Sequence, residues 1–262
     1  MVRKRQKAPP VILSIAGYDP SSGAGIAADI KTISAHGCYG VTCITALTVQ
    51  STLGVERVVP VTGKLVSETL KALASDVEIA AVKIGMLDSA DAARAVVGFL
   101  RQSRPAIVVI DPVIRSSSGT DLISADAMRV LQTRLLPLAT VITPNIAEAA
   151  ALTGLKVQSR QEMLAAAEHL QSMGPASVII TGGHLRRPAD LVSEMAKRPV
   201  FLNGRRIKSS SSHGTGCVFS TALTCNLAHG LTVGQAARRA KSFVRAALRQ
   251  PPGIGKGTGP II

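Results

Sequence analysis

The stretch Ser212-His213-Gly214-Thr215-Gly216-Cys217 opens a segment, residues 218–230, whose apolar residues recur at the spacing of a helix. Glycine lets an anion approach the unpaired backbone N–H groups at a helix start, so the Gly-Thr-Gly turn predicts a cradle for a phosphate or an oxyanion. Cys217 is expected in the first helical turn, where the helix dipole favours its thiolate over its thiol. The alternative is an ordinary helix start with Cys217 as a small core residue.

The composition around this stretch indicates an α/β fold. The chain has 262 residues, of which 46% are hydrophobic, and strands rich in Val and Ile alternate with helices rich in Ala. Such buried strands are typical of a mostly parallel sheet covered by helices on both faces. The alternation is even and shows no repeat or break, so we expect a basic N-terminal tail at 1–10 and one domain at 11–262.

Charge and cysteine usage restrict the class of function. The formal net charge is +14, but only six residues are aromatic, and no zinc finger or helix-turn-helix motif is visible. We therefore expect a small anionic substrate and no nucleic-acid partner. No apolar run reaches the length of about 18 residues that spans a membrane, and we expect no membrane partner. The four cysteines match no zinc or redox spacing, which favours a reducing, cytoplasmic location.

Three strand ends carry polar or flexible residues. A buried strand at 11–16 leads into a loop of small residues at 17–25, which starts a helix at 26–37. A second strand at 40–50 ends in Gln50, and a third at 107–113 carries Asp111 near its end. Ligands bind beyond the carboxyl ends of parallel strands, so these ends predict a ligand site. Gln50 can hydrogen-bond an aminopyrimidine-like edge, or it is a surface residue. A buried carboxylate such as Asp111 suggests an ion pair or a metal.

The remaining elements continue the alternation of strands and helices. We expect helices at 69–75, 90–100, 161–173 and 235–250, strands at 80–87, 140–145 and 177–184, and a hairpin of 200–202 with 206–208 through Asn203-Gly204. Asn145 and Glu148 have the spacing of a helix cap with its N3 glutamate. The same spacing equally fits an amide and a carboxylate beside a Mg²⁺–phosphate group.

In this order the segments resemble the hydroxymethylpyrimidine/phosphomethylpyrimidine kinases of the ribokinase-like superfamily. The resemblance spans about residues 11–260 and lies in eight motifs, at residues 16–32, 44–50, 83–87, 111–113, 142–149, 182–184, 213–217 and 255–260. It implies a single-domain three-layer sandwich. It also implies phosphoryl transfer from Mg-ATP to 4-amino-5-hydroxymethyl-2-methylpyrimidine and then to its monophosphate, in thiamine biosynthesis.

The resemblance also assigns residues. The substrate pocket maps onto Gly17, Ala24, Asp29, Gln50, Met86 and Val113. ATP and its phosphates map onto Asn145, Glu148, Thr181, His213 and Thr215, and Mg²⁺ onto Asp111 and Glu148. Gly214 and Gly216 would stabilise the transferring phosphoryl group, and Cys217, where ribokinase relatives carry aspartate, would take the hydroxyl proton. We expect a homodimer. Pyridoxal kinase, or a pyrimidine-binding protein without catalysis, are the alternatives.

The sequence departs from the family pattern where phosphate-facing lysines are usual, at Ser117 and Thr181, and Ser211-Ser212 replaces Asn-Thr. Arginine grips phosphate in a bidentate way, so Arg115, and Arg186 or Arg187, are candidates to supply the missing charge. The departures leave the second phosphorylation open.

Overall fold

The computed structural model describes residues 8–116, 119–183, 185 and 187–262, and within them nine strands form one sheet in the order β3-β2-β1-β4-β5-β6-β7-β8-β9. Neighbouring strands from β2 to β7 run parallel, and the edge pairs β2–β3, β7–β8 and β8–β9 are antiparallel. The expected mostly parallel sheet is confirmed. Of the predicted basic tail, residues 1–7 lie outside the described residues.

The strands are β1 (Val11–Tyr18), β2 (Tyr39–Ser51), β3 (Gly54–Pro60), β4 (Ile79–Ile84), β5 (Val108–Ile110), β6 (Val141–Ile142), β7 (Ser177–Ile180), β8 (Ala189–Glu194) and β9 (Val200–Asn203). The helices are α1 (Gly25–Ala35), α2 (Gly63–Asp76), α3 (Ala90–Ser103), α4 (Ala125–Val130), α5 (Ile146–Thr153), α6 (Arg160–Ser172), α7 (Thr215–Ala228) and α8 (Val233–Arg249). A π-helical turn (Leu131–Leu135) and a 3-10 turn (Leu136–Leu138) continue α4.

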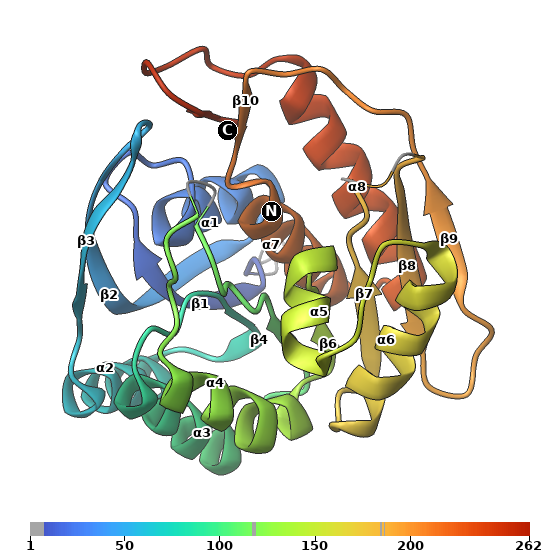
Figure 1. The fold of residues 1–262 in the computed structure, drawn as a ribbon. Coiled ribbons are helices and arrows are strands. Elements are labelled where there is room, and N and C mark those ends of the chain that lie inside the picture. The colour runs from blue at the N-terminus through green and yellow to red at the C-terminus, as the bar shows by residue number, and fades with distance from the viewer. Residues whose placement is uncertain (1–7, 117–118, 184, 186) are drawn as a thin grey trace, which may run out of the picture.

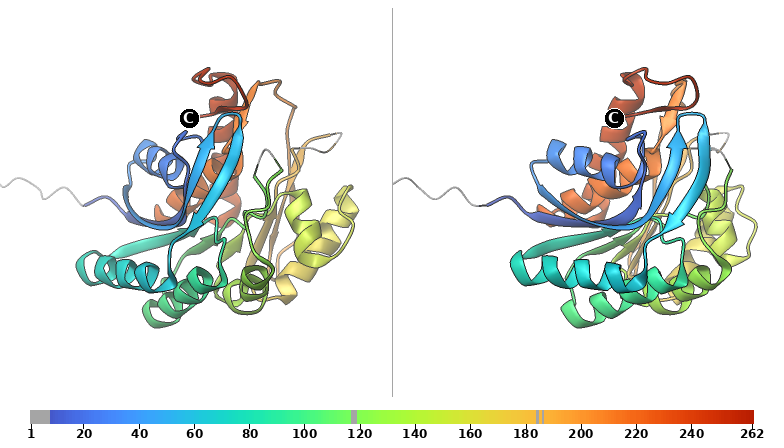
Figure 2. Two further views of the ribbon diagram at one scale, coloured as in Figure 1. Left: turned by 60° about the vertical axis from the view of Figure 1, so that its left-hand side comes forward. Right: turned by 90° about the vertical axis from the view of Figure 1, so that its left-hand side faces the viewer.

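Helices cover both faces of the sheet, which makes three layers (Figures 1 and 2). Successive strand residues point to opposite faces, so Val108 and Ile110 pack in the core with α2 to α6, whereas Val109 packs in a second core with α7 and α8. The helix α1 lies beside α7 on the second face. Strands buried on both sides need continuous apolar runs, and this is the pattern seen in the sequence.

The last residues of the chain pair with the segment that precedes α7. A short parallel pair joins β10 (Ser211–His213) to β11 (Gly259–Pro260). The glycine-rich segment before β11 passes the β2–β3 turn, where the Gly257 N–H donates to the Thr52 hydroxyl. The β2–β3 pair extends as a ribbon toward the side on which the C-terminus lies (Figure 2).

One predicted element is wrong. The Asn203-Gly204 turn does not begin a hairpin, and residues 204–210 contain no strand. Instead β9 pairs with β8, which the sequence reading missed, in the register Ala189 with Asn203. The Gly204 N–H donates to the Pro188 carbonyl, and Arg245 of α8 donates to the Arg205 carbonyl. These contacts draw the chain toward α8. The strand β3 and the helix α4 were also missed.

Candidate active site

Two glycine-containing turns meet at the carboxyl end of the sheet. Gly214 adopts φ +80°, and a Cβ on it would lie 1.8 Å from the Gly23 carbonyl oxygen. Gly25, at φ +55°, is as tightly placed, because its Cβ would lie 2.2 Å from the Gly17 carbonyl oxygen. Only glycine combines this backbone conformation with this close approach. The loop at 17–25 and the Gly-Thr-Gly turn are therefore held together.

Asp19 organises the first loop, a role that sequence reasoning missed. Its carboxylate accepts hydrogen bonds from the Ser21 and Ala24 N–H groups at 2.8 and 2.9 Å, and it contacts His213 Nε2 at 2.7 Å. Burial alone would raise the pKa of Asp19, but the bonds from His213 and Ser21 outweigh it and lower that pKa. The Asp-Pro-Ser order, typical of a turn closed by an aspartate side chain, was the available signal.

His213 joins this loop to Gln50. Its Nε2 lies 3.1 Å from Gln50 Nε2, so the imidazole stands between the predicted pyrimidine reader and Asp19. The ring is 8% exposed. The resemblance assigned His213 to the ATP phosphates, and in the structure its imidazole contacts Asp19 and Gln50. Thr215, by contrast, lies at the open start of α7.

Three residues of the predicted substrate pocket lie close together. Met86 belongs to a small buried cluster with Ala46 and Leu122, and Val113 packs against it. A Cβ on Gly17 would lie 2.8 Å from the Met86 sulfur, so the strand end at Gly17 also contacts this cluster. Ala24 is the N-cap of α1. Gly17 of β1, Met86 after β4 and Val113 after β5 therefore lie together at the carboxyl edge.

The carboxylate of Asp111 lies beneath the Gly-Thr-Gly turn. Its oxygens are 3.8 Å from where a Cβ of Gly216 would stand, and it accepts a hydrogen bond of 3.0 Å from Ser220. Burial raises the pKa of Asp111, although Lys83 and the Ser220 hydroxyl oppose this. A negative group at this place repels a phosphate unless a cation lies between them.

Asn145 and Glu148 form a complete capping box on α5. The Glu148 N–H donates to Asn145 Oδ1 at 2.9 Å, and the Asn145 N–H donates to Glu148 Oε2 at 2.8 Å. Burial, together with the nearby Asp111 carboxylate, raises the pKa of Glu148 to about 8. The cap explains the spacing, and the second carboxylate beside Asp111 leaves the metal interpretation open. Among the described residues, no group of three or more His, Cys, Asp or Glu side chains is arranged around a metal.

Cys217 lies in the first turn of α7, as predicted, but its thiol is not acidic. The side chain is partly exposed, yet it stands among protein groups. Their burial of the sulfur raises the pKa of Cys217 to about 12, and the Lys83 ammonium offsets only part of this. The helix dipole favours the thiolate, but burial of the sulfur acts in the opposite direction and is the larger effect on this pKa.

Asp29, which the resemblance assigned to the substrate pocket, lies in a buried polar network. It is fully buried and pairs with the Lys83 ammonium at 2.9 Å. Ser14 and Thr221 donate to its two oxygens at 2.6 and 2.7 Å. Asp29 thus connects α1 to β1, β4 and α7 beneath the site. Neither Lys83 nor Thr221 was singled out from the sequence, since their partners are more than 50 residues away.

The two positions that lack the usual lysines, and the arginines that could supply the missing charge, lie in different surroundings. Thr181 pairs with Asn145 in an isolated parallel bridge beside β7, close to the capping box. Arg115 is exposed and pairs with Asp121 at 2.6 Å. Arg187 lines a cavity of about 470 Å³ beside α6, with Gln158, Arg160 and Leu185. Ser117 and Arg186 lie outside the described residues.

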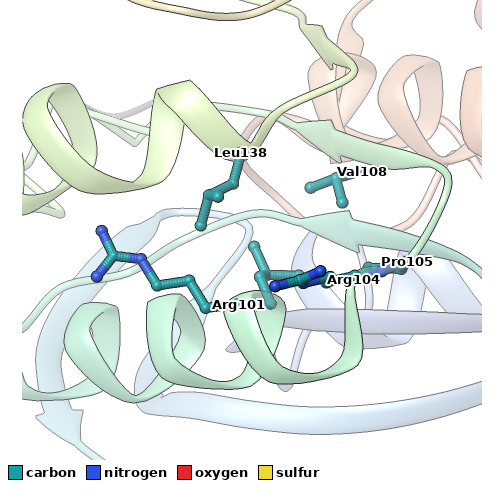
Figure 3. Close-up of a pocket in the computed structure, with 6 residues that line it drawn as sticks. Arg101, Arg104, Pro105, Val108 and Leu138 are labelled. Atoms are coloured by element: carbon teal, nitrogen blue, oxygen red, sulfur yellow. The ribbon is translucent and has the colours of Figure 1, made fainter.

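One cavity lies away from this site. It measures about 520 Å³ and is lined by Leu100, Arg101, Arg104, Pro105, Val108 and Leu138. Figure 3 shows these side chains at the amino end of β5, between α3 and the turn before β6. They lie at the opposite end of β5 from Asp111. The chemistry of the carboxyl edge, and not cavity size, therefore identifies the candidate site.

Comparison with known proteins agrees with this geometry. Residues 19–262 match the family model described as phosphomethylpyrimidine kinase. The hydroxymethylpyrimidine/phosphomethylpyrimidine kinase of Haemophilus influenzae is 41% identical over 254 residues, which cover 95% of this chain and 94% of that protein.

Two solved structures have the same fold. The phosphomethylpyrimidine kinase of Clostridium difficile is 36% identical, with a TM-score of 0.82 over 91% of this chain and 99% of that one. The pyridoxal kinase of Bacillus subtilis, solved as an ADP complex, is 31% identical, with a TM-score of 0.88 over 97% of this chain and 96% of that one.

The sheet order and the turn at the start of α7 are thus those of a ribokinase-like kinase that phosphorylates small molecules. Within that class, the chain belongs to the phosphomethylpyrimidine kinase family. No helix in the described part of the chain is both long and apolar enough to cross a membrane.

Proposed function

We propose that this kinase transfers the γ-phosphoryl group of ATP to the hydroxymethyl oxygen of 4-amino-5-hydroxymethyl-2-methylpyrimidine, and then phosphorylates the monophosphate, in thiamine biosynthesis. The observation that supports this best is the contact between the two turns. Gly214 touches Gly23, so the anion-binding start of α7 lies directly beside the loop that borders Gln50 and Met86. A phosphoryl donor and a ring-bearing alcohol could therefore meet there.

Each residue near this contact has its own role in the proposed reaction. Gln50 offers both an amide donor and an acceptor to the aminopyrimidine edge, while Met86 and Val113 pack on the ring. The N–H groups at Gly214, Thr215 and Gly216 stabilise the charge that develops on the transferring group. Cys217 takes the hydroxyl proton as the oxygen attacks phosphorus. His213, held by Asp19, keeps Gln50 in place.

We further propose that Asp111 and Glu148 hold Mg²⁺ with the ATP phosphates, with Asn145 and Thr181 beside them. Two buried carboxylates, one raising the pKa of the other, are stabilised by a divalent cation. Mg²⁺ commonly uses one or two carboxylates and completes its shell with water and phosphate oxygens. When bound, Mg²⁺ would neutralise phosphate charge that Asp111 otherwise repels.

The reaction is tested by comparing two alcohols. With ATP and Mg²⁺, we expect faster ADP release on addition of the hydroxymethylpyrimidine than on addition of pyridoxal. Chelation of Mg²⁺ should stop ADP release, and added Mg²⁺ should restore it. Pyridoxal is the relevant competitor because a pyridoxal kinase is 31% identical over 97% of this chain.

The other outcomes are equally informative. Equal rates, or faster release with pyridoxal, would favour a pyridoxal kinase. Tight pyrimidine binding without ADP release would favour a binding protein on a kinase scaffold. Incubation of the enzyme with ATP, Mg²⁺ and the monophosphate as the only acceptor tests the second phosphorylation, which the missing lysines leave open.

We also propose that the enzyme is a homodimer that works in the cytoplasm, where ATP is supplied and cysteines stay reduced. The β2–β3 ribbon exposes Leu47, Val49, Leu53 and Val59, and Leu47 is paired with Val59 across the two strands. Such an apolar patch fits a second copy of the same surface. Sedimentation should give a dimer, and Leu47→Glu with Val59→Glu should give a monomer. A wild-type monomer at high concentration would contradict the proposal.

A further inference from the structure

The helices α1 and α7 start at the active site and end together at the far side of the molecule. His36 is the C-cap of α1, and His229 is the C-cap of α7. Cys38 follows the glycine turn after α1, and Cys225 lies in the last turn of α7. Cys38 and Cys225 share one small buried cluster with Ile12, Ile33 and Ala81. The proposed reaction uses none of these thiols.

The contacts within this group are polar as well as apolar. His229 Nε2 lies 3.4 Å from the Cys38 sulfur and 2.9 Å from the His36 carbonyl oxygen. The His229 backbone N–H donates to the Cys225 carbonyl at 3.0 Å, so His229 contacts both cysteines. Cys38 therefore lies beside the His229 imidazole and in the same buried cluster as Cys225.

The two thiols are unequal. The hydrogen bond from Cys225, opposed by burial and helped by the charge of His229, lowers the pKa of Cys38 to about 7. The same bond and burial raise the pKa of Cys225. Cys38 is 8% exposed, whereas Cys225 is completely buried. Cys38 is thus the less buried and the more acidic of the two, and a thiolate backed by a protonated thiol is the arrangement of an attacking and a resolving cysteine.

We propose that Cys38 and Cys225 are an oxidisable dithiol that forms a disulfide when the protein meets a hydroperoxide. The Cys38 thiolate bonds to one peroxide oxygen, the O–O bond breaks, and the hydroxide that leaves takes up a proton to become water. The Cys225 sulfur then bonds to the Cys38 sulfur and the S–O bond breaks. The leaving hydroxide takes the Cys225 proton. Two thiols are oxidised, and hydrogen peroxide is reduced to two waters.

The other two cysteines serve as internal comparisons. Cys43 is 1% exposed, and burial raises its pKa to about 11. Its thiol lies against the Val66 carbonyl oxygen. Cys217 is partly exposed, and burial of its sulfur also raises its pKa. Neither has the combination of low pKa and neighbouring thiol that Cys38 has.

The test uses the full-length reduced protein and hydrogen peroxide. After brief oxidation, remaining thiols are alkylated, and the protein is weighed intact and digested for peptide mass spectrometry. We expect the loss of two hydrogen atoms and a cross-linked peptide pair that contains Cys38 and Cys225. Cys43 and Cys217 should be recovered alkylated. Recovery of Cys38 and Cys225 as separate alkylated residues, or earlier oxidation of Cys217, would overturn the proposal.

Three variants sharpen the result. Cys225→Ser should leave Cys38 as a sulfenic acid that a dimedone probe traps, and Cys43→Ser, the matched buried control, should cross-link like the wild type. His229→Gln should slow the oxidation by about fivefold at pH 7, because raising a thiol pKa of about 7 by about one unit lowers the thiolate fraction from about one half to about one tenth. If His229→Gln is oxidised as fast as the wild type, His229 does not activate the Cys38 thiol, and the proposed mechanism is wrong. The wild-type measurement stands even if a variant folds poorly.

Discussion

Replacing Cys217 by alanine is expected to lower kcat by about 10²–10⁴-fold, the usual effect of removing a general base. The change should leave pyrimidine affinity nearly unaltered, because Gln50, Met86 and Val113 remain. Cys217 lies in the first turn of α7, close to Asp111. No other thiol among the described residues stands at this turn.

The raised pKa gives this prediction a second readout. With a thiol pKa of about 12, the thiolate fraction rises about tenfold per pH unit below that value. If ligands lower this pKa only in part, the wild-type kcat rises with pH above neutrality. The alanine variant should lose this rise, and Cys217→Asp should recover activity with a flatter profile, since a carboxylate is already ionised at neutral pH.

Steady-state rates at saturating ATP and pyrimidine, measured across pH, check this expectation. Cys43→Ala is the matched control, because Cys43 is a buried cysteine on β2 away from Asp111, and its kcat should stay at the wild-type value. If Cys217→Ala turns over as fast as the wild type at saturation, Cys217 is not the base and is only a small residue at a helix start.

The second large effect concerns stability. Lys83→Met is expected to lower the free energy of unfolding by about 3–5 kcal/mol, because it leaves the buried carboxylate of Asp29 without its cation. Lys83 and Asp29 are both completely buried and 2.9 Å apart. The ammonium also lies close to Asp111 and Cys217. Its positive charge therefore also stabilises the ionised forms of these two groups.

A double variant separates the charge from the packing. Lys83→Met with Asp29→Asn removes both charges, and most of the lost stability should return, since replacing a whole buried pair costs far less than breaking it. Arg129→Met is the surface control, because Arg129 pairs with Asp126 in solvent and such pairs add little. Urea unfolding of the four proteins gives the comparison. A double variant as unstable as Lys83→Met would contradict the ion-pair explanation.

Much of the fold could be predicted because local patterns decide it. The apolar run at 107–113 can only be a strand buried on both faces, and Asp111 at its end must then lie at the carboxyl edge. The Gly-Thr-Gly sequence likewise fixes a helix start, and the structure begins α7 at Thr215. The β8–β9 pair was missed because the Asn203-Gly204 turn signal is local. The hydrogen bond from Arg245 of α8 to the Arg205 carbonyl, by contrast, joins residues that are 40 positions apart.

The polar network under the site could not be predicted, for a different physical reason. Asp29 meets Lys83 and Thr221 across separations of 54 and 192 residues. His213 meets Asp19 across 194 residues. Periodicity carries no information on such pairs. The burial that raises the pKa of Cys217 could likewise not be predicted, since the position of Cys217 in the helix is local but the protein that buries its sulfur comes from distant segments.

The return of the chain to β10 has a practical consequence for handling this protein. The strand β11 pairs Pro260 with His213, Ile261 is buried, and the Ile262 carbonyl oxygen accepts a hydrogen bond from Lys31 of α1. A purification tag or reporter domain fused behind Ile262 would pull on the strand that positions the imidazole between Asp19 and Gln50. The same fusion placed before residue 8 would join the chain ahead of β1, which begins at the opposite end of the sheet from that imidazole.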